Sequence, residues 1–182
     1  MTRPTSAPAT LAHFTRASRG YSALDHLVTI LREGRIRGSS RMVPGDRPVV
    51  CLFDGPIGDL SRVLVRANRR RYEPFGVAID KRYAYTSGAR PVIYMSLGEA
   101  QELLDAEELW RVMGIDLTRT PPVDWTFERE WRLPGDLPLE ASSTVALVES
   151  WQDVAEVYDR FDNAPPCAGV IPLENLFGSR AA

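Results

Sequence analysis

The chain has 182 residues, of which 44% are hydrophobic and 25% are charged, and its formal net charge is −2. This length suits one domain that is stable without disulfides or metals, and the composition argues against the disordered, fibrous and membrane classes. The longest apolar runs have the length of a strand, far below the ~20 residues that a helix needs to span a bilayer. The first residues lack the hydrophobic core of a signal peptide, so we expect a cytoplasmic protein without membrane contact.

The basic residues are nearly all arginine, because Lys81 is the only lysine in the chain. This skew indicates an arginine-favouring genome, with phosphate recognition as a secondary interpretation. Cys51 and Cys167 each stand among apolar neighbours, which predicts two buried small side chains rather than a disulfide or a metal pair. The His and Cys residues show no zinc spacing, so we expect no metal site of that kind.

The N-terminal region predicts a strand followed by a helix. We expect residues 1–9 to be a flexible N-terminus and residues 10–178 to form one domain. Side chains alternate in character over residues 10–15, which is typical of a strand. Ser22 then precedes an apolar stripe at helical spacing, and Gly34 follows it where a C-terminal cap belongs, which predicts a helix between these two residues.

The central region predicts three strands and one helical segment. Residues 49–53, 75–79 and 91–96 are short β-branched or apolar runs, as strands are, and a plain turn signal ends the first of them. Residues 57–64 are apolar at helical spacing and lead into a group of arginines, Arg66, Arg69, Arg70 and Arg71. These arginines suit either contact with nucleic-acid phosphates or a solvated helix end.

The last third predicts two strands and further helices. Alternation over residues 125–133 and the run 144–148 indicate strands, whereas residues 98–113 and 151–161 have helical spacing. Pro172 predicts the first turn of a short terminal helix. Helices and strands alternate loosely at first and strands dominate later, which favours an α+β fold. The aromatic side chains of the first of these strands are expected to be core: Trp125, Phe127 and Trp131.

Glu128 and Glu130 form a candidate acidic pair. On one strand they point the same way at a separation of about 7 Å, because side-chain direction repeats every second residue. Two carboxylates held that close polarise a sugar hydroxyl and stabilise a developing cation. The alternative is a solvated face of an edge strand, on which Arg129 and Arg132 provide ordinary ion pairs.

His13 and Thr15 are a second candidate pair, since both point to one face of the first predicted strand. An imidazole and a hydroxyl together can hold a ribose hydroxyl and an amide. The alternative is a histidine satisfied within the core. His26 lies inside the first predicted helix, and the sequence assigns it no role.

The opening of the chain resembles that of ADP-ribosyltransferase-fold proteins, such as the poly-ADP-ribose polymerases, the tRNA 2′-phosphotransferases and the DNA-modifying DarT toxins. Their first strand carries His-x-Ser/Thr, which residues 11–15 match as Leu-Ala-His-Phe-Thr, and the helix after it has the form "L..IL..G", which residues 27–34 match. Four later blocks look like a bacterial group found around abortive infection, including AbiGi-like proteins. These blocks are residues 50–56, 72–79, 88–94 and 124–132.

The resemblance implies a split antiparallel or mixed β-sheet flanked by helices, with a cleft for NAD as substrate. It implies that His13 and Thr15 hold the nicotinamide ribose and that a late glutamate binds its 2′-hydroxyl. Glu128 and Glu130 also resemble the Glu-x-Glu of toxin transferases, which makes Glu130 the catalytic residue and Glu128 the one that orients the acceptor. The other candidates for NAD contact are aromatic, with the ring that stacks on nicotinamide left open: Phe14, Tyr94 and Tyr85, besides Tyr83 and Phe53.

The function implied is NAD-dependent ADP-ribosyl transfer or NAD cleavage in phage defence or a toxin–antitoxin system. The expected partners are a nucleic-acid or protein acceptor and a cognate toxin or antitoxin. One alternative is a non-catalytic antitoxin or regulator of the same fold that binds a protein or nucleic acid. Another is a nuclease-like effector in which Asp54, Glu128 and Glu130 surround a divalent metal, because carboxylates suit hard cations.

Overall fold

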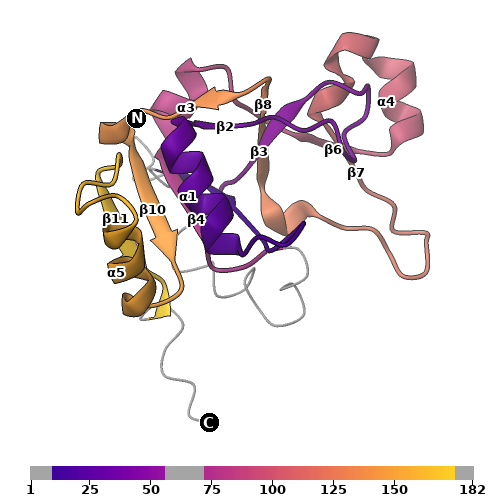
Figure 1. The fold of residues 1–182 in the computed structure, drawn as a ribbon. Helices are drawn as coiled ribbons and strands as arrows, with labels where there is room; N and C mark the ends of the chain where they lie inside the picture. Colours follow the sequence, from indigo (N-terminus) through magenta and orange to yellow (C-terminus); the bar gives the residue numbers. More distant parts are fainter. Residues whose placement is uncertain (1–9, 56–71, 175–182) are drawn as a thin grey trace, which may run out of the picture.

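The computed structural model describes residues 10–55 and 72–174 (Figure 1). Three expectations lie outside these residues: the flexible N-terminus, the helical segment over 57–64 with the arginines that follow it, and most of the terminal helix. Among the helices of the described residues, none combines the length and the apolar character that a membrane crossing requires.

A seven-stranded mixed sheet forms the centre of the described residues, in the order β11-β10-β4-β1-β3-β8-β5. Neighbouring strands are antiparallel except β10 and β11, which are parallel. The fold is therefore α+β, as the sequence predicts. The strands are β1 (Thr10–Phe14), β3 (Val49–Phe53), β4 (Gly76–Asp80), β5 (Arg90–Pro91), β8 (Glu130–Pro134), β10 (Thr144–Val148) and β11 (Gly169–Pro172).

The sheet is split between β1 and β3. These two strands are paired at Ala12 and Phe53 alone, whereas β1 pairs with β4, and β3 with β8, over five residues each. The sheet thus consists of two well-paired halves, β11-β10-β4-β1 and β3-β8-β5, which meet at a narrow junction. The split sheet implied by the family resemblance is confirmed.

Two small sheets and four helices complete the described residues. β2 (Arg35–Ile36) pairs with β9 (Leu137–Pro138), and β6 (Ile93–Met95) pairs in parallel with β7 (Val112–Gly114). The helices are α1 (Ala23–Glu33), α3 (Lys81–Thr86), α4 (Leu97–Leu103) and α5 (Trp151–Asp159), and three 3-10 turns are η3 (Ala106–Arg111), η4 (Thr126–Glu128) and η5 (Ala141–Ser143).

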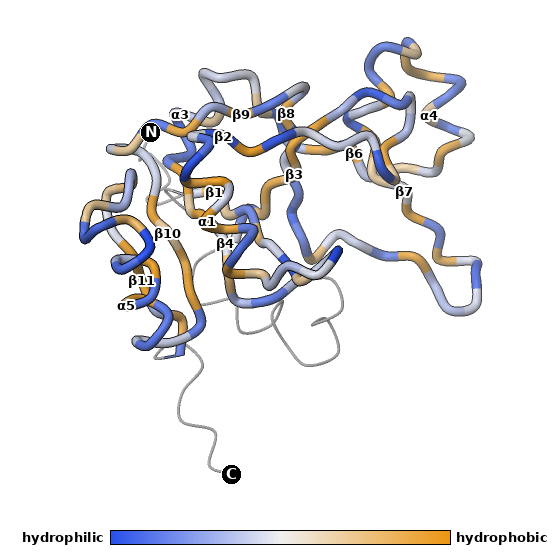
Figure 2. Tube along the Cα trace, viewed as in Figure 1, coloured by the Kyte–Doolittle hydropathy of each residue, from blue (hydrophilic) through white to orange (hydrophobic). Residues whose placement is uncertain are grey.

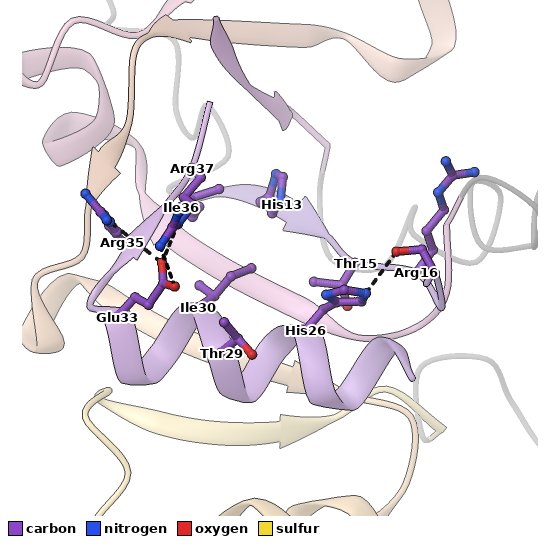
Figure 3. A pocket seen from close by; sticks show the side chains of 11 residues that line it. His13, Thr15, Arg16, His26, Thr29, Ile30, Glu33, Arg35, Ile36 and Arg37 are labelled. Atoms are coloured by element: carbon purple, nitrogen blue, oxygen red, sulfur yellow. Dashed lines mark hydrogen bonds and ion pairs between the residues drawn. The ribbon is translucent and has the colours of Figure 1, made fainter. Parts of the chain in front are cut away.

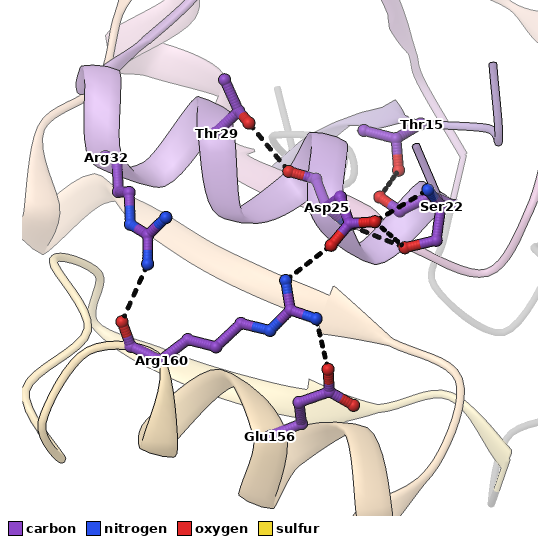
Figure 4. Close-up of polar contacts among 8 residues, drawn as sticks. Thr15, Ser22, Asp25, Thr29, Arg32, Glu156 and Arg160 are labelled. Carbon is purple, nitrogen blue, oxygen red and sulfur yellow. Dashed lines mark hydrogen bonds and ion pairs between the residues drawn. The ribbon is translucent and has the colours of Figure 1, made fainter. Parts of the chain in front are cut away.

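Helix α1 forms where the sequence predicts it, and its ends show why. The Ser22 hydroxyl accepts the backbone N–H of Asp25, while the Asp25 carboxylate accepts the backbone N–H of Ser22, so each residue satisfies an N–H group. Gly34 ends the helix in the left-handed region at φ 60°, which glycine adopts without steric cost. The Asp25 carboxylate also accepts a hydrogen bond from Arg160, 2.6 Å away, which joins α1 to the end of α5 (Figure 4).

The main core lies between the sheet, α1 and α5. Leu11 of β1, Leu27 of α1 and Val157 of α5 belong to one buried cluster, whereas Ala12 faces a smaller cluster on the other side of the sheet. Figure 2 shows the apolar stretches that β4 and β10 contribute. The alternation predicted for the first strand is therefore confirmed.

Several expectations about the elements are wrong. The helix predicted over 98–113 breaks after Leu103, because Leu104 is extended and residues 112–114 pair with β6 instead. Pro172 ends a strand, β11, rather than opening a helix. Cys51 is exposed and Cys167 is half-buried, so neither is the buried residue that was expected, although both are free thiols as predicted.

Candidate active site at the split of the sheet

His13 lies on β1 beside the junction of the two half-sheets. Its Nδ1 is 2.9 Å from the carbonyl oxygen of Cys51 on β3. Because a carbonyl oxygen can only accept, Nδ1 carries the hydrogen and Nε2 of the neutral ring is an acceptor. Burial among protein atoms lowers the pKa of His13, which favours this neutral form. The histidine thus bridges the split and is ready to accept a hydrogen bond.

Thr15 has a more structural position than expected. Its side chain is 7% exposed, and its hydroxyl lies 2.8 Å from the carbonyl oxygen of Ala23 and 3.1 Å from that of Phe75. A hydroxyl has one hydrogen to donate, and these carbonyl groups compete for it. Thr15 therefore fixes the end of β1 to the first turn of α1 and to the residue before β4, while it still lines the cavity beside His13.

Two cavities meet at His13, which lines both. The larger, about 290 Å³, lies between β1, α1 and β2 and contains Arg16, His26 and Glu33 in its wall (Figure 3). The smaller, about 100 Å³, opens over β1, β3 and the start of β8. Its wall consists of Ala12, His13, Phe14, Cys51, Leu52, Phe53, Tyr72, Glu128 and Glu130. His26, to which the sequence assigned no role, therefore belongs to the site.

Glu130 is the first residue of β8 and is only 5% exposed. Its Oε1 accepts a hydrogen bond from Nε of Arg132, which is 2.9 Å away and itself 2% exposed. Its backbone N–H donates to the Tyr94 hydroxyl at 3.0 Å. β8 lies between β3 and β5, so the alternative of a solvated edge strand is wrong for this glutamate.

Glu128 reaches the same cavity by another route. It lies in η4, one turn before β8, and is 6% exposed, with the Tyr72 hydroxyl donating to its Oε1. Arg129, in the left-handed region at φ 46°, separates the turn from the strand. The expectation that both glutamates project from one strand is therefore wrong, but both residues line the same cavity.

The turn before β8 has a local cause. The Asp124 carboxylate accepts hydrogen bonds from the backbone N–H and the hydroxyl of Thr126, at 2.9 and 2.7 Å. Such contacts offer the backbone an alternative to the strand ladder. Because of this turn, two of the aromatic side chains expected in the core are not buried there: Phe127 is exposed and Trp125 is half-buried. An Asp two residues before a Thr was the sequence signal for this turn.

The aromatic candidates separate into two groups. Phe14 and Phe53 line the smaller cavity, and the rings of Phe14 and Tyr72 pack edge to face; sequence reasoning missed Tyr72. Tyr85 lies elsewhere, 51% exposed on α3 with Arg90 stacked on its ring, so it is not part of this site. Tyr83, which remained open, donates its hydroxyl to the carbonyl oxygen of Pro138 instead.

Cys51 is the other residue of the cavity that sequence reasoning did not place there. Its thiol lies next to Glu130 and Arg132, across β3 and β8. The protein atoms packed around it, followed by the negative charge of Glu130, raise the pKa of the Cys51 thiol well above its usual range. The residue still presents surface to solvent, but its thiol stays protonated and is a poor nucleophile.

Asp54 does not join the two glutamates. Its Oδ2 accepts hydrogen bonds from Lys81 at 2.7 Å and from the indole N–H of Trp131 at 3.0 Å. Trp131 points to the opposite face of β8 from Glu130, because strand side chains alternate. Within residues 10–55 and 72–174, no three His, Cys, Asp or Glu side chains form a group that could hold a metal ion. The arrangement of a metal between Asp54 and the glutamates has no support here.

A split mixed sheet with a cavity at its junction defines this α+β domain. No protein-family model matches the sequence, and no curated protein matches it. The solved structure of DarT from Thermus sp. 2.9 in complex with carba-NAD+ has a similar fold, with a TM-score of 0.53 and 13% sequence identity over 94% of this chain and 99% of that one. The same DarT in complex with NAD+ has a TM-score of 0.47 at 13% identity, over 97% of this chain and all of the other. The likeness to the carba-NAD+ complex of DarT shows the fold alone.

Proposed function

We propose that this protein is an NAD-consuming ADP-ribosyltransferase whose reaction takes place in the smaller cavity. The observation that carries the proposal is the convergence of His13, Glu128 and Glu130 on one cavity wall at the split of the sheet. A protein of similar fold, DarT, has been solved with carba-NAD+. Both the site and the fold therefore favour NAD as the substrate.

His13 suits the binding of a ribose. Its Nδ1–H is held by the Cys51 carbonyl, so Nε2 is left as the acceptor for a ribose hydroxyl. The aromatic wall beside it, formed by Phe14, Phe53 and Tyr72, suits the flat nicotinamide ring. The larger cavity on the other side of His13 has room for more of the dinucleotide.

Glu130 suits the stabilisation of positive charge on the ribose. When the glycosidic bond breaks, nicotinamide leaves with the bonding electron pair and the C1′ centre becomes cationic. A carboxylate fixed in a water-poor cavity stabilises that charge strongly, and Arg132 holds the Glu130 carboxylate in one orientation. An acceptor nucleophile then forms the new bond to C1′ with its own electron pair.

Glu128 suits the acceptor side of the reaction. Its carboxylate is held by the Tyr72 hydroxyl in the same cavity wall, where it can orient the nucleophile and take up its proton. The proposed acceptor is a nucleic acid or a protein. The proposed setting is bacterial phage defence or a toxin–antitoxin system with a cognate partner. The AbiGi-like sequence blocks support this setting, and the likeness to AbiGi-like proteins itself stays a prediction.

The test is a titration of the purified protein with NAD by calorimetry, together with the rate of nicotinamide release. The Glu130→Gln variant removes the negative charge with little change of shape. The Glu102→Gln variant is the matched control, because Glu102 is exposed on α4, outside the lining of either cavity. We expect Glu130→Gln to bind NAD but to lower the release rate about 100-fold or more, and Glu102→Gln to match the wild type.

The same titration separates the alternative of a non-catalytic regulator. NAD binding without release in the wild type would favour that alternative. If the wild type neither binds NAD nor releases nicotinamide, the proposal is rejected.

A further inference from the structure

Arg132 is a buried arginine whose side chain joins Glu130 to a distant part of the chain. Its Nε donates to Glu130 Oε1 at 2.9 Å, and its Nη1 donates to the carbonyl oxygens of Trp110 and Val112, each at 2.8 Å. Its Nη2 lies 3.4 Å from Glu130 Oε2 and 3.9 Å from the sulfur of Met113. The planar guanidinium is thus held on one side by the carboxylate and on the other by the backbone before and within β7.

Two further contacts link Glu130 to the same region. The Glu130 N–H donates to the Tyr94 hydroxyl, and the Glu130 carbonyl oxygen accepts the N–H of Val92, each at 3.0 Å. We name residues 92–114 the β6–β7 lobe, because β6 and β7 pair within it; it lies beside β8, with α4 at its outer end (Figure 1). This lobe therefore bonds both to the backbone of Glu130 and to Arg132, the partner of the Glu130 carboxylate.

A buried ion pair is an expensive way to stabilise a fold. Removing two charges from water costs several kcal/mol for each ion, and apolar side chains of similar size often stabilise a protein as well or better. Glu130 is 5% and Arg132 2% exposed, so this pair incurs that cost. At the same time Glu130 lines the smaller cavity. The pair is better explained by the need to keep a carboxylate charged and correctly oriented there.

We propose that Arg132 is the positioning residue for Glu130 and that it transmits the placement of the β6–β7 lobe to the reaction site. This inference rests on the proposed function. The fork of the guanidinium is essential to it, because one group must reach the carboxylate and two backbone carbonyls at once. A lysine ammonium keeps the charge but is a single point with a different reach.

The Arg132→Lys variant tests the proposal. We expect kcat for nicotinamide release to fall about 100-fold, while the calorimetric Kd for NAD stays within about threefold, because NAD binding does not require the fork. Amide hydrogen exchange of Val92 and Glu130 should become faster, since these two N–H groups report the contact between the lobe and β8. The matched control is Arg160→Lys, which loosens the ion pair between α5 and α1 and should change neither kcat nor the exchange of those amides.

The outcomes are distinct. A kcat of Arg132→Lys within threefold of the wild type overturns the proposal, and so does unchanged exchange of Val92 and Glu130. If Arg132→Lys does not fold, a second experiment uses the wild type: the NMR resonance of the Arg132 Nε–H is followed as carba-NAD is added. A change in its chemical shift supports the proposal. An unchanged chemical shift with the analogue bound overturns it. If the wild type neither binds nor cleaves NAD, the proposed function fails by itself, while faster exchange in Arg132→Lys still supports the link between lobe and Glu130.

Discussion

Nε of Arg132 lies 2.9 Å from Oε1 of Glu130, two residues earlier on β8, and two backbone carbonyls of the β6–β7 lobe accept hydrogen bonds from the same guanidinium. The carboxylate is thereby placed by a contact between two parts of the chain that are 20 residues apart or more. Each partner depends on the other, since either charge alone would be buried without its counterion.

This dependence predicts a strongly non-additive pair of variants. Arg132→Met alone leaves the Glu130 charge buried without its partner and should lower the free energy of unfolding by about 3–5 kcal/mol. The double variant Arg132→Met/Glu130→Leu removes both charges and should recover most of that loss. Urea unfolding of the two single variants and the double variant measures the coupling. Additive losses would contradict the view that each charge needs the other.

Replacing Gly76 by any residue with a Cβ is predicted to destabilise the fold, because β4 passes very close to β1 there. A Cβ at this position would lie 2.1 Å from the carbonyl oxygen of His13. Gly76→Ala should therefore lower the free energy of unfolding by about 2–3 kcal/mol and weaken NAD binding by displacing His13. The control is Gly98→Ala in α4, where a Cβ meets nothing within 4 Å and should be neutral or slightly stabilising. Equal free energies of unfolding for the two variants would contradict this prediction, because they would show that β1 moves away from the added methyl group at little cost.

Acidification should destabilise the protein through His13. Burial lowers the pKa of His13 below its ordinary value, so at mildly acidic pH the unfolded chain binds a proton that the folded protein does not. Stability therefore rises with pH below the ordinary value of ~6.5 and levels off above it, by at most about 1.4 kcal/mol for each pH unit. Urea midpoints between pH 5 and 7.5 should depend less on pH in His13→Gln than in the wild type. His26→Gln is the matched control for loss of an imidazole, and an unchanged pH dependence in His13→Gln would reject this role.

Tyr72 should affect the transfer step more than the stability of the fold. Tyr72→Phe keeps the ring beside Phe14 but removes the hydroxyl that donates to Glu128. If Glu128 orients the acceptor, ADP-ribosyl transfer should fall roughly tenfold, equivalent to about 1.4 kcal/mol, while nicotinamide release into water changes less. The matched control is Tyr83→Phe, which removes a hydroxyl bonded to Pro138 outside the lining of both cavities. A parallel fall of transfer and release would assign Glu128 to bond cleavage instead.

The sequence by itself determined the elements whose signals are local. Ser22 and Gly34 bound α1 because side-chain capping and a left-handed glycine act within one turn. The strands over 49–53 and 144–148 have the bounds that their apolar runs predict. The split sheet was expected from the resemblance of the opening motif to ADP-ribosyltransferase-fold proteins, and the structure has such a sheet.

Only the tertiary structure decided how the site is assembled. The alternation over 125–133 predicted one strand, but the Asp124 contacts and the turn at Arg129 override it, and the two glutamates converge from different elements. Tyr72 lines the smaller cavity and Tyr85 does not, and no local pattern in the sequence distinguishes these two tyrosines. The helix predicted over 98–113 ends early, because residues 112–114 form β7 and pair with β6. The turn before β8 is the exception, because its cause is a local contact between Asp124 and Thr126. In the other cases an interaction between distant residues outweighs a local preference of a few tenths of a kcal/mol for each residue, which is why periodicity alone could not predict it.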